Sequence, residues 1–101
     1  MLLYEKKRNT LTVRLTGELD HRVAAAIRTE LDELILDPRI RRLVFELDKL
    51  EFMDSSGIGL IIGRYKLMAR RGGTVAVSSP HQRVDRIFEM AGLYQLIERL
   101  A

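Results

Sequence analysis

The chain has 101 residues, of which 47% are apolar and 31% charged, and this ordinary globular composition predicts one folded domain over residues 1–101. It contains no cysteine and two histidines, which excludes disulfides, thiolate metal sites and cysteine nucleophiles and makes a multi-histidine metal site unexpected. The net charge is +3, but acids are interleaved with the bases and no aromatic ladder accompanies them, so direct nucleic-acid binding is not expected.

A β-hairpin is predicted at the start of the chain. Residues 11–15 alternate apolar and polar side chains, as a half-buried strand does. Residues 2–5 are its expected hairpin partner, with residues 6–10 as the turn.

A helix and a third strand are predicted next. Asp20 is a plausible helix N-cap, and Asp37-Pro38 ends the helix because the residue before proline avoids the helical region. Residues 42–47 have the alternation of a strand. The helical stripe consists of Val23, Ile27, Leu31, Leu34 and Ile35.

A second helix follows two adjacent serines and stops at Gly72-Gly73, before a short strand at residues 74–78. Its apolar stripe consists of Ile58, Ile61, Ile62, Tyr65 and Met68.

A third helix is expected after Ser79, which is read as its N-cap with Pro80 at the first helical position. Val84, Ile87, Phe88 and Ala91 supply its stripe, Gly92 caps it, and residues 93–100 are expected to form one more short helix.

The predicted order β-β-α-β-α-β-α-α gives an α/β fold with a mixed four-stranded sheet, since strand–helix–strand units require parallel pairing. Thr12 and Arg14 share one face of their strand, and Thr74, Ala76 and Ser78 share one face of another. A sheet covered on both sides would be apolar throughout. We therefore expect the helices on one face only.

The stretch Asp54-Ser55-Ser56-Gly57 is predicted to lie at the N-terminus of the second helix. Plain capping is one interpretation, because aspartate and serine oxygens accept the free N–H groups of a first turn. A serine nucleophile would need a general base, and nothing in the sequence places His21 or His81 beside Ser55. The glycines do not form a Walker pattern either.

Phosphoacceptor is the remaining functional interpretation of the two hydroxyls, and the residues alone do not choose between Ser55 and Ser56. Gly59 and Gly63 either extend a smooth surface for another chain or allow the helix to pack closely on the sheet. No apolar run is long enough to span a bilayer and no signal peptide is apparent, so a cytoplasmic protein without a membrane partner is expected.

The segments FMDSSGIGLIIGRYK, LTGELDH and FEMAGLYQLI resemble the anti-sigma factor antagonists of the STAS domain family, most closely the sporulation antagonist of endospore-forming bacteria. The predicted element order covers the whole chain and agrees with the fold of that family. The resemblance implies a STAS-like fold and a single STAS domain.

The same resemblance implies a regulator that is not an enzyme and is controlled by phosphorylation. In unphosphorylated form it binds an anti-sigma factor that is also a serine kinase, and the sigma factor is freed. The kinase uses its own ATP, so this chain needs no cofactor or metal, and a PP2C-type phosphatase restores the active form. The acceptor maps onto Ser55, and the partner-binding residues onto Glu18, Asp20, Asp54, Ser56, Gly57 and Ile58.

Two alternatives remain open at this point. A general-stress antagonist of the same group would share the chemistry and differ in partner. A STAS subunit serving a lipid or anion transporter would be a scaffold without a kinase.

Overall fold

A computed structural model describes residues 2–100, whose main sheet contains five strands in the order β1-β2-β4-β6-β7. β1 is antiparallel to β2, and the other neighbours in this sheet are parallel. The α/β class and the mixed sheet are therefore confirmed. The strands are β1 (Leu2–Lys7), β2 (Thr10–Leu15), β4 (Arg42–Glu46), β6 (Thr74–Ser78) and β7 (Glu98–Leu100).

Two short strands, β3 (Gly17–Leu19) and β5 (Leu50–Met53), pair in parallel as a separate ribbon. The helices are α1 (His21–Ile35), α2 (Ser55–Arg70) and α3 (Gln82–Met90), followed by the 3₁₀ turn η1 (Leu93–Gln95). Among residues 2–100, no helix combines the length and the apolar character that crossing a membrane requires.

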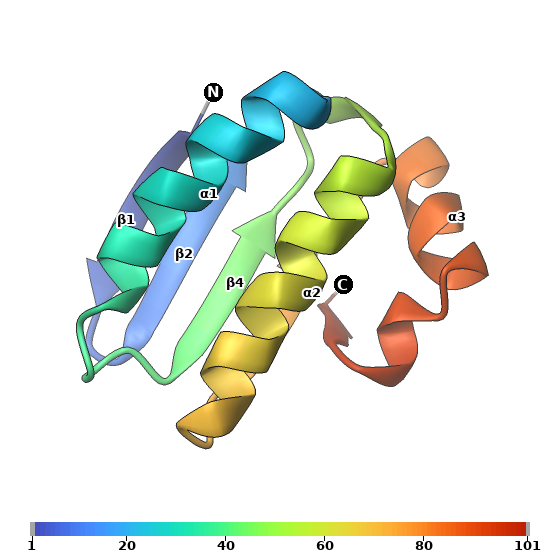
Figure 1. Cartoon of the computed structure of the whole chain (residues 1–101). Helices are drawn as coiled ribbons and strands as arrows, with labels where there is room; N and C mark the ends of the chain where they lie inside the picture. Colours follow the sequence, from blue (N-terminus) through green and yellow to red (C-terminus); the bar gives the residue numbers. More distant parts are fainter. Residues whose placement is uncertain (1, 101) are drawn as a thin grey trace.

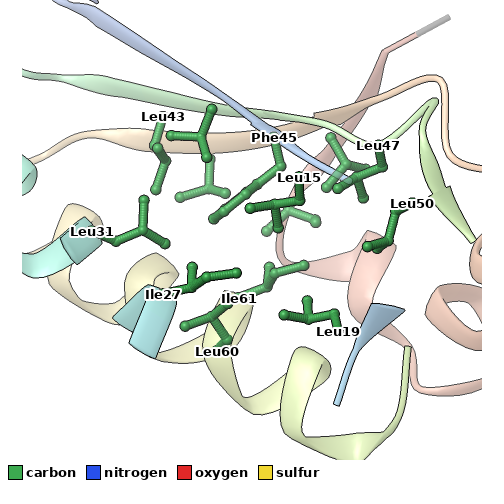
Figure 2. Packing of buried hydrophobic residues seen from close by; sticks show 14 of the residues in the cluster. Leu15, Leu19, Ile27, Leu31, Leu43, Phe45, Leu47, Leu50, Leu60 and Ile61 are labelled. Carbon is green, nitrogen blue, oxygen red and sulfur yellow. The ribbon is translucent and has the colours of Figure 1, made fainter. Parts of the chain in front are cut away.

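Helices α1 and α2 lie side by side across one face of the main sheet, as predicted (Figure 1). The core fills the space between them and the strands. Figure 2 shows Phe45 and Leu43 of β4 pointing toward Ile27 and Leu31 of α1 and Ile61 of α2. Leu31, Leu43, Phe45 and Ile61 have no exposed surface, so this contact anchors both helices on the sheet.

The opposite face of the sheet carries polar side chains in register across the strands. Arg14 of β2 lies opposite Glu46 of β4, and their side chains are 3.6 Å apart (Nη2 to Oε2). Arg42 of β4 forms a 3.2 Å ion pair with Glu98 of β7. The expected half-polar face is therefore present, with helices on the other side.

The prediction of four strands is wrong because three short strands, β3, β5 and β7, were missed. Three or four residues are too few to show a period of two. The last helix, expected over residues 93–100, is instead η1 followed by β7, which gains its backbone partners from the edge of β6. Gly92 ends α3 as predicted and adopts a left-handed φ of 70°.

The start of α3 also differs from its prediction. The helix begins at Gln82 with His81 at the N-cap position, not at Pro80 after a Ser79 cap. Ser79 has a φ of 51°, a left-handed conformation in which the chain turns before the helix starts. The Ser-Pro pair therefore marks a loop here.

Candidate functional site

The β3–β5 ribbon brings the starts of α1 and α2 together at one end of the molecule. Leu19 lies opposite Met53 in this parallel pair, and each strand ends one residue before a helix N-cap. The two N-caps are Asp20 and Asp54. Because the strands are in register, two aspartates that are 34 positions apart in the sequence lie at neighbouring helix starts (Figure 1).

Both aspartates cap their helices through the side-chain carboxylate. The Asp20 carboxylate accepts a hydrogen bond from the Val23 N–H at 3.0 Å, which confirms the predicted cap. The Asp54 carboxylate accepts one from the Ser56 N–H at 2.8 Å. The capping interpretation of the Asp-Ser-Ser-Gly stretch is therefore right for Asp54, and the two serines are the first residues of α2.

The two serines differ in their surroundings. Ser55 is exposed, whereas Ser56 is half-buried and its Oγ lies 3.4 Å from Nδ1 of His21, the first residue of α1. No local pattern predicts a histidine beside this motif, because the contact joins the starts of two different helices. A nucleophilic serine also needs a third group that orients its base, and among residues 2–100 no recorded hydrogen bond supplies a carboxylate to His21.

Gly57 is buried directly beneath the serines. A Cβ at this position would lie 2.2 Å from Cγ of Met53 and 3.0 Å from a methyl group of Leu19. The reason for glycine here is therefore the close packing of α2 on the β3–β5 ribbon. Gly57, which the resemblance places among the partner-binding residues, is thus itself buried.

The remaining predicted site residues surround this helix start. Glu18 is exposed in β3 and lies opposite Phe52 of β5. Ile58 is half-buried and packs on the core. Phe52, 44% exposed, was missed by the sequence analysis, although its aromatic side chain beside Glu18 adds an apolar group to the same surface. We call Glu18, Asp20, Phe52, Asp54 and Ser55 the switch surface. The two aspartates in it are half-buried, and the other three residues are exposed.

Gly59 and Gly63 face open space, since a Cβ at either position would meet nothing within 4 Å. The suggestion that they allow α2 to pack closely on the sheet is therefore wrong. They line a groove of about 340 Å³ between α1 and α2, whose walls also include His21, Arg28, Ser56 and Arg64.

Arg64 of α2 is charged but buried, which the helical pattern did not predict. It is 7% exposed, and its Nε lies 3.1 Å from Oδ1 of Asp32 on α1. Burial lowers the pKa of the Arg64 guanidinium, and the Asp32 carboxylate partly offsets that effect. The side chain thus links α1 and α2.

The STAS domain family model matches residues 2–101. An anti-sigma F factor antagonist of Paenibacillus polymyxa is 43% identical over 93 residues, which cover 92% of this chain and 80% of that protein. An anti-sigma-B factor antagonist of Bacillus subtilis (strain 168) is 28% identical over 94 residues, which cover 93% of this chain and 84% of that protein.

Solved structures show the same likeness. The anti-sigma factor antagonist SpoIIAA in its unphosphorylated form superposes with a TM-score of 0.88 at 29% identity, covering all of this chain and 89% of that one. The phosphorylated form of the Bacillus cell fate determinant SpoIIAA gives a TM-score of 0.80 at 28% identity, covering all of this chain and 92% of that one. Because the family model matches residues 2–101, the chain belongs to the STAS domain family.

Proposed function

We propose that this protein is an anti-sigma factor antagonist whose switch is the hydroxyl group of Ser55. In the unphosphorylated form it binds an anti-sigma factor that is also a serine kinase, and the sigma factor is released. The kinase transfers phosphate from its own ATP to Ser55, the complex separates, and a PP2C-type phosphatase regenerates the binding form. This role requires no catalysis by the chain itself and is performed in the cytoplasm.

The exposed position of Ser55 at the start of α2 carries this proposal. Its neighbour Ser56 is half-buried beside His21, so Ser55 is the more accessible of the two hydroxyls. The names of the antagonists similar to this chain, and the existence of phosphorylated and unphosphorylated forms of one of them, support the assignment.

The switch surface supplies the chemistry for docking. Glu18, Asp20 and Asp54 place three carboxylates around Ser55 in a chain whose net charge is +3. Phe52 adds an aromatic group, and such groups are enriched among the residues that dominate binding energy. We therefore expect a basic partner surface with an apolar pocket, and Ser56, Gly57 and Ile58 support this surface from within α2.

Phosphorylation of Ser55 disrupts such a complex by local repulsion. A phosphoserine carries about −1.5 to −2 charges, and docking would bury it beside Asp54. A ~100-fold loss of affinity corresponds to only about 2.7 kcal/mol. One like charge at ~4 Å and an effective dielectric constant near 20 gives roughly 4 kcal/mol before screening. No refolding of the chain is required.

The sporulation antagonists are the better match within this group. The identity is 43% with the anti-sigma F factor antagonist and 28% with the anti-sigma-B factor antagonist. We therefore propose an anti-sigma F type partner, and a general-stress partner is the second candidate.

The test is a binding and phosphorylation assay with the cognate anti-sigma factor, with and without ATP. The parent protein should bind, become phosphorylated at Ser55 and dissociate when ATP is added, with the site mapped by mass spectrometry. Ser55→Ala should bind and stay bound with ATP. Ser56→Ala is the matched control and should still be phosphorylated and released. Phosphate mainly on Ser56, or a phosphorylated form that binds as tightly as the parent, would refute the mechanism.

A further inference from the structure

The groove between α1 and α2 is a second polar feature, next to the switch surface but separate from it. His21, Ala24 and Arg28 form its wall on α1, and Ser56, Gly59, Gly63 and Arg64 contribute to its wall on α2. The two glycines leave the groove open, because each is one helical turn from the other and neither carries a side chain. Its volume of about 340 Å³ suits a small ligand.

Arg64 is an unusual residue to find in this wall. Its side chain is 8% exposed, and its Nη1 is buried without a hydrogen-bond partner among the described residues. An arginine has five N–H donors, and Asp32 is its one recorded ion-pair partner in this part of the chain. Buried donors without partners are costly, so the site has unused capacity to bind an acceptor.

The charges around the groove favour an anion. Arg28 stands on the opposite wall and is close enough for its positive charge to lower the pKa of Arg64. None of the residues that line the groove carries a carboxylate. Asp32, whose side chain is 43% exposed, pairs with Arg64 from outside this lining.

The helices themselves add to this field. The N-termini of α1 and α2 lie at the same end of the molecule (Figure 1), where His21 and Ser56 line the groove. A helix N-terminus carries a partial positive charge and favours anions. Four donor-bearing side chains on two helices therefore surround a space that is lined by no carboxylate.

We propose that this groove binds a small tetrahedral oxyanion of the phosphate class, held between Arg28 and Arg64 and contacted at its mouth by Ser56 and His21. Guanidinium groups bind phosphate through two parallel hydrogen bonds each, and two of them on opposite walls match an anion with several acceptor oxygens. A planar carboxylate would engage one of the two guanidinium groups. The site is distinct from Ser55, whose exposed hydroxyl is not among the residues that line the groove.

The experiment is a titration of the isotope-labelled protein with inorganic phosphate at constant ionic strength, followed by NMR of backbone and arginine side-chain signals. Saturable shifts are expected at Ser56, Gly59 and Gly63. Arg28→Gln should weaken binding by at least about tenfold, because a hydrogen bond to a charged group contributes ~1.5–3 kcal/mol. The matched control is Arg22→Gln, since Arg22 is exposed on the same helix but does not line the groove.

Several outcomes would overturn the proposal. They are the absence of saturable shifts, shifts confined to other parts of the molecule, and equal affinity of the parent and Arg28→Gln. Acetate binding as tightly as phosphate would overturn the assignment of the ligand class. The assay contains no anti-sigma factor, so its result is independent of the proposed function.

Discussion

Replacing Gly57 by alanine should destabilise the protein, although the same replacement two residues later should stabilise it. The added Cβ at position 57 would lie 2.2 Å from Cγ and 2.5 Å from Sδ of Met53. Met53 and Leu19, the other neighbour, are 2% and 1% exposed. Because the nearest atom is close to the Met53 backbone, the side chain cannot move away without displacing other core groups.

The expected magnitude follows from two opposing effects. Overpacking a core typically costs about 1–3 kcal/mol. Alanine is favoured over glycine within a helix by roughly 1 kcal/mol, which offsets part of that cost. Gly57→Ala should therefore lower the free energy of unfolding by up to about 2 kcal/mol, or the Tm by up to roughly 15 °C in a domain of this size.

Gly59→Ala is the matched control, because its Cβ would meet nothing within 4 Å. It should raise the free energy of unfolding by about 0.5–1 kcal/mol. Equilibrium unfolding in urea, followed by circular dichroism, measures both variants. If Gly57→Ala proves as stable as Gly59→Ala, close packing is not the reason for glycine at position 57.

Three further predictions concern charges. Ser55→Asp should lose much of its affinity for the anti-sigma factor while its Tm changes by a few degrees at most. The Tm should change little because the helix N-terminus favours the new charge by ~0.3–1 kcal/mol and the Asp54 carboxylate opposes it. A large change in the circular dichroism spectrum would contradict this prediction. Asp20→Asn should keep the N-cap of α1, since asparagine caps about as well as aspartate, but should weaken docking in a binding assay. An equal loss of stability and binding would mean that capping is the whole role of Asp20. Hydrogen bonds from Arg99 and Tyr94 hold the pKa of Asp85 below its usual range. The ionised Asp85 carboxylate therefore stabilises the folded protein fully above the pKa of about 3.9 that it has in the unfolded chain, and this contribution is lost as the pH falls through the lower pKa of the folded state. Asp85→Asn should thus lower the Tm at pH 7 by an amount that corresponds to about 1 kcal/mol, and the difference should shrink toward pH 2, whereas a difference independent of pH would contradict the assignment.

The caps of α1 and α2 could be predicted from the sequence because their chemistry is local. Asp20 and Asp54 each bond to a backbone N–H two or three residues ahead. The ribbon of β3 and β5 could not be predicted, since its pairing joins segments more than 30 residues apart and each strand is too short to show a period. The contact between Ser56 and His21 depends on that ribbon and was missed for the same reason.

The buried face of α2 differs from its predicted stripe for another physical reason. The prediction selected Ile58, Ile62 and Tyr65, which are half-buried, and omitted Arg64, which is buried. An arginine is normally assigned to the solvent side of a helix. Here Asp32 of the neighbouring helix partly neutralises it, and this partner is not visible in the sequence around position 64.

The switch surface is formed before any partner arrives. The Asp54 cap and the packing of Gly57 hold the backbone from 54 to 57 in one conformation. Ordering one residue of a flexible loop costs roughly 1–2 kcal/mol of conformational entropy, so four residues presented by such a loop would cost about 4–8 kcal/mol on docking. A pre-organised surface avoids that loss, and the proposed phosphorylation of Ser55 would therefore act directly on its affinity through the added charge. Under the proposed mechanism, the same rigidity would require the kinase to recognise Ser55 on a folded helix start, where shape selects the substrate together with local sequence.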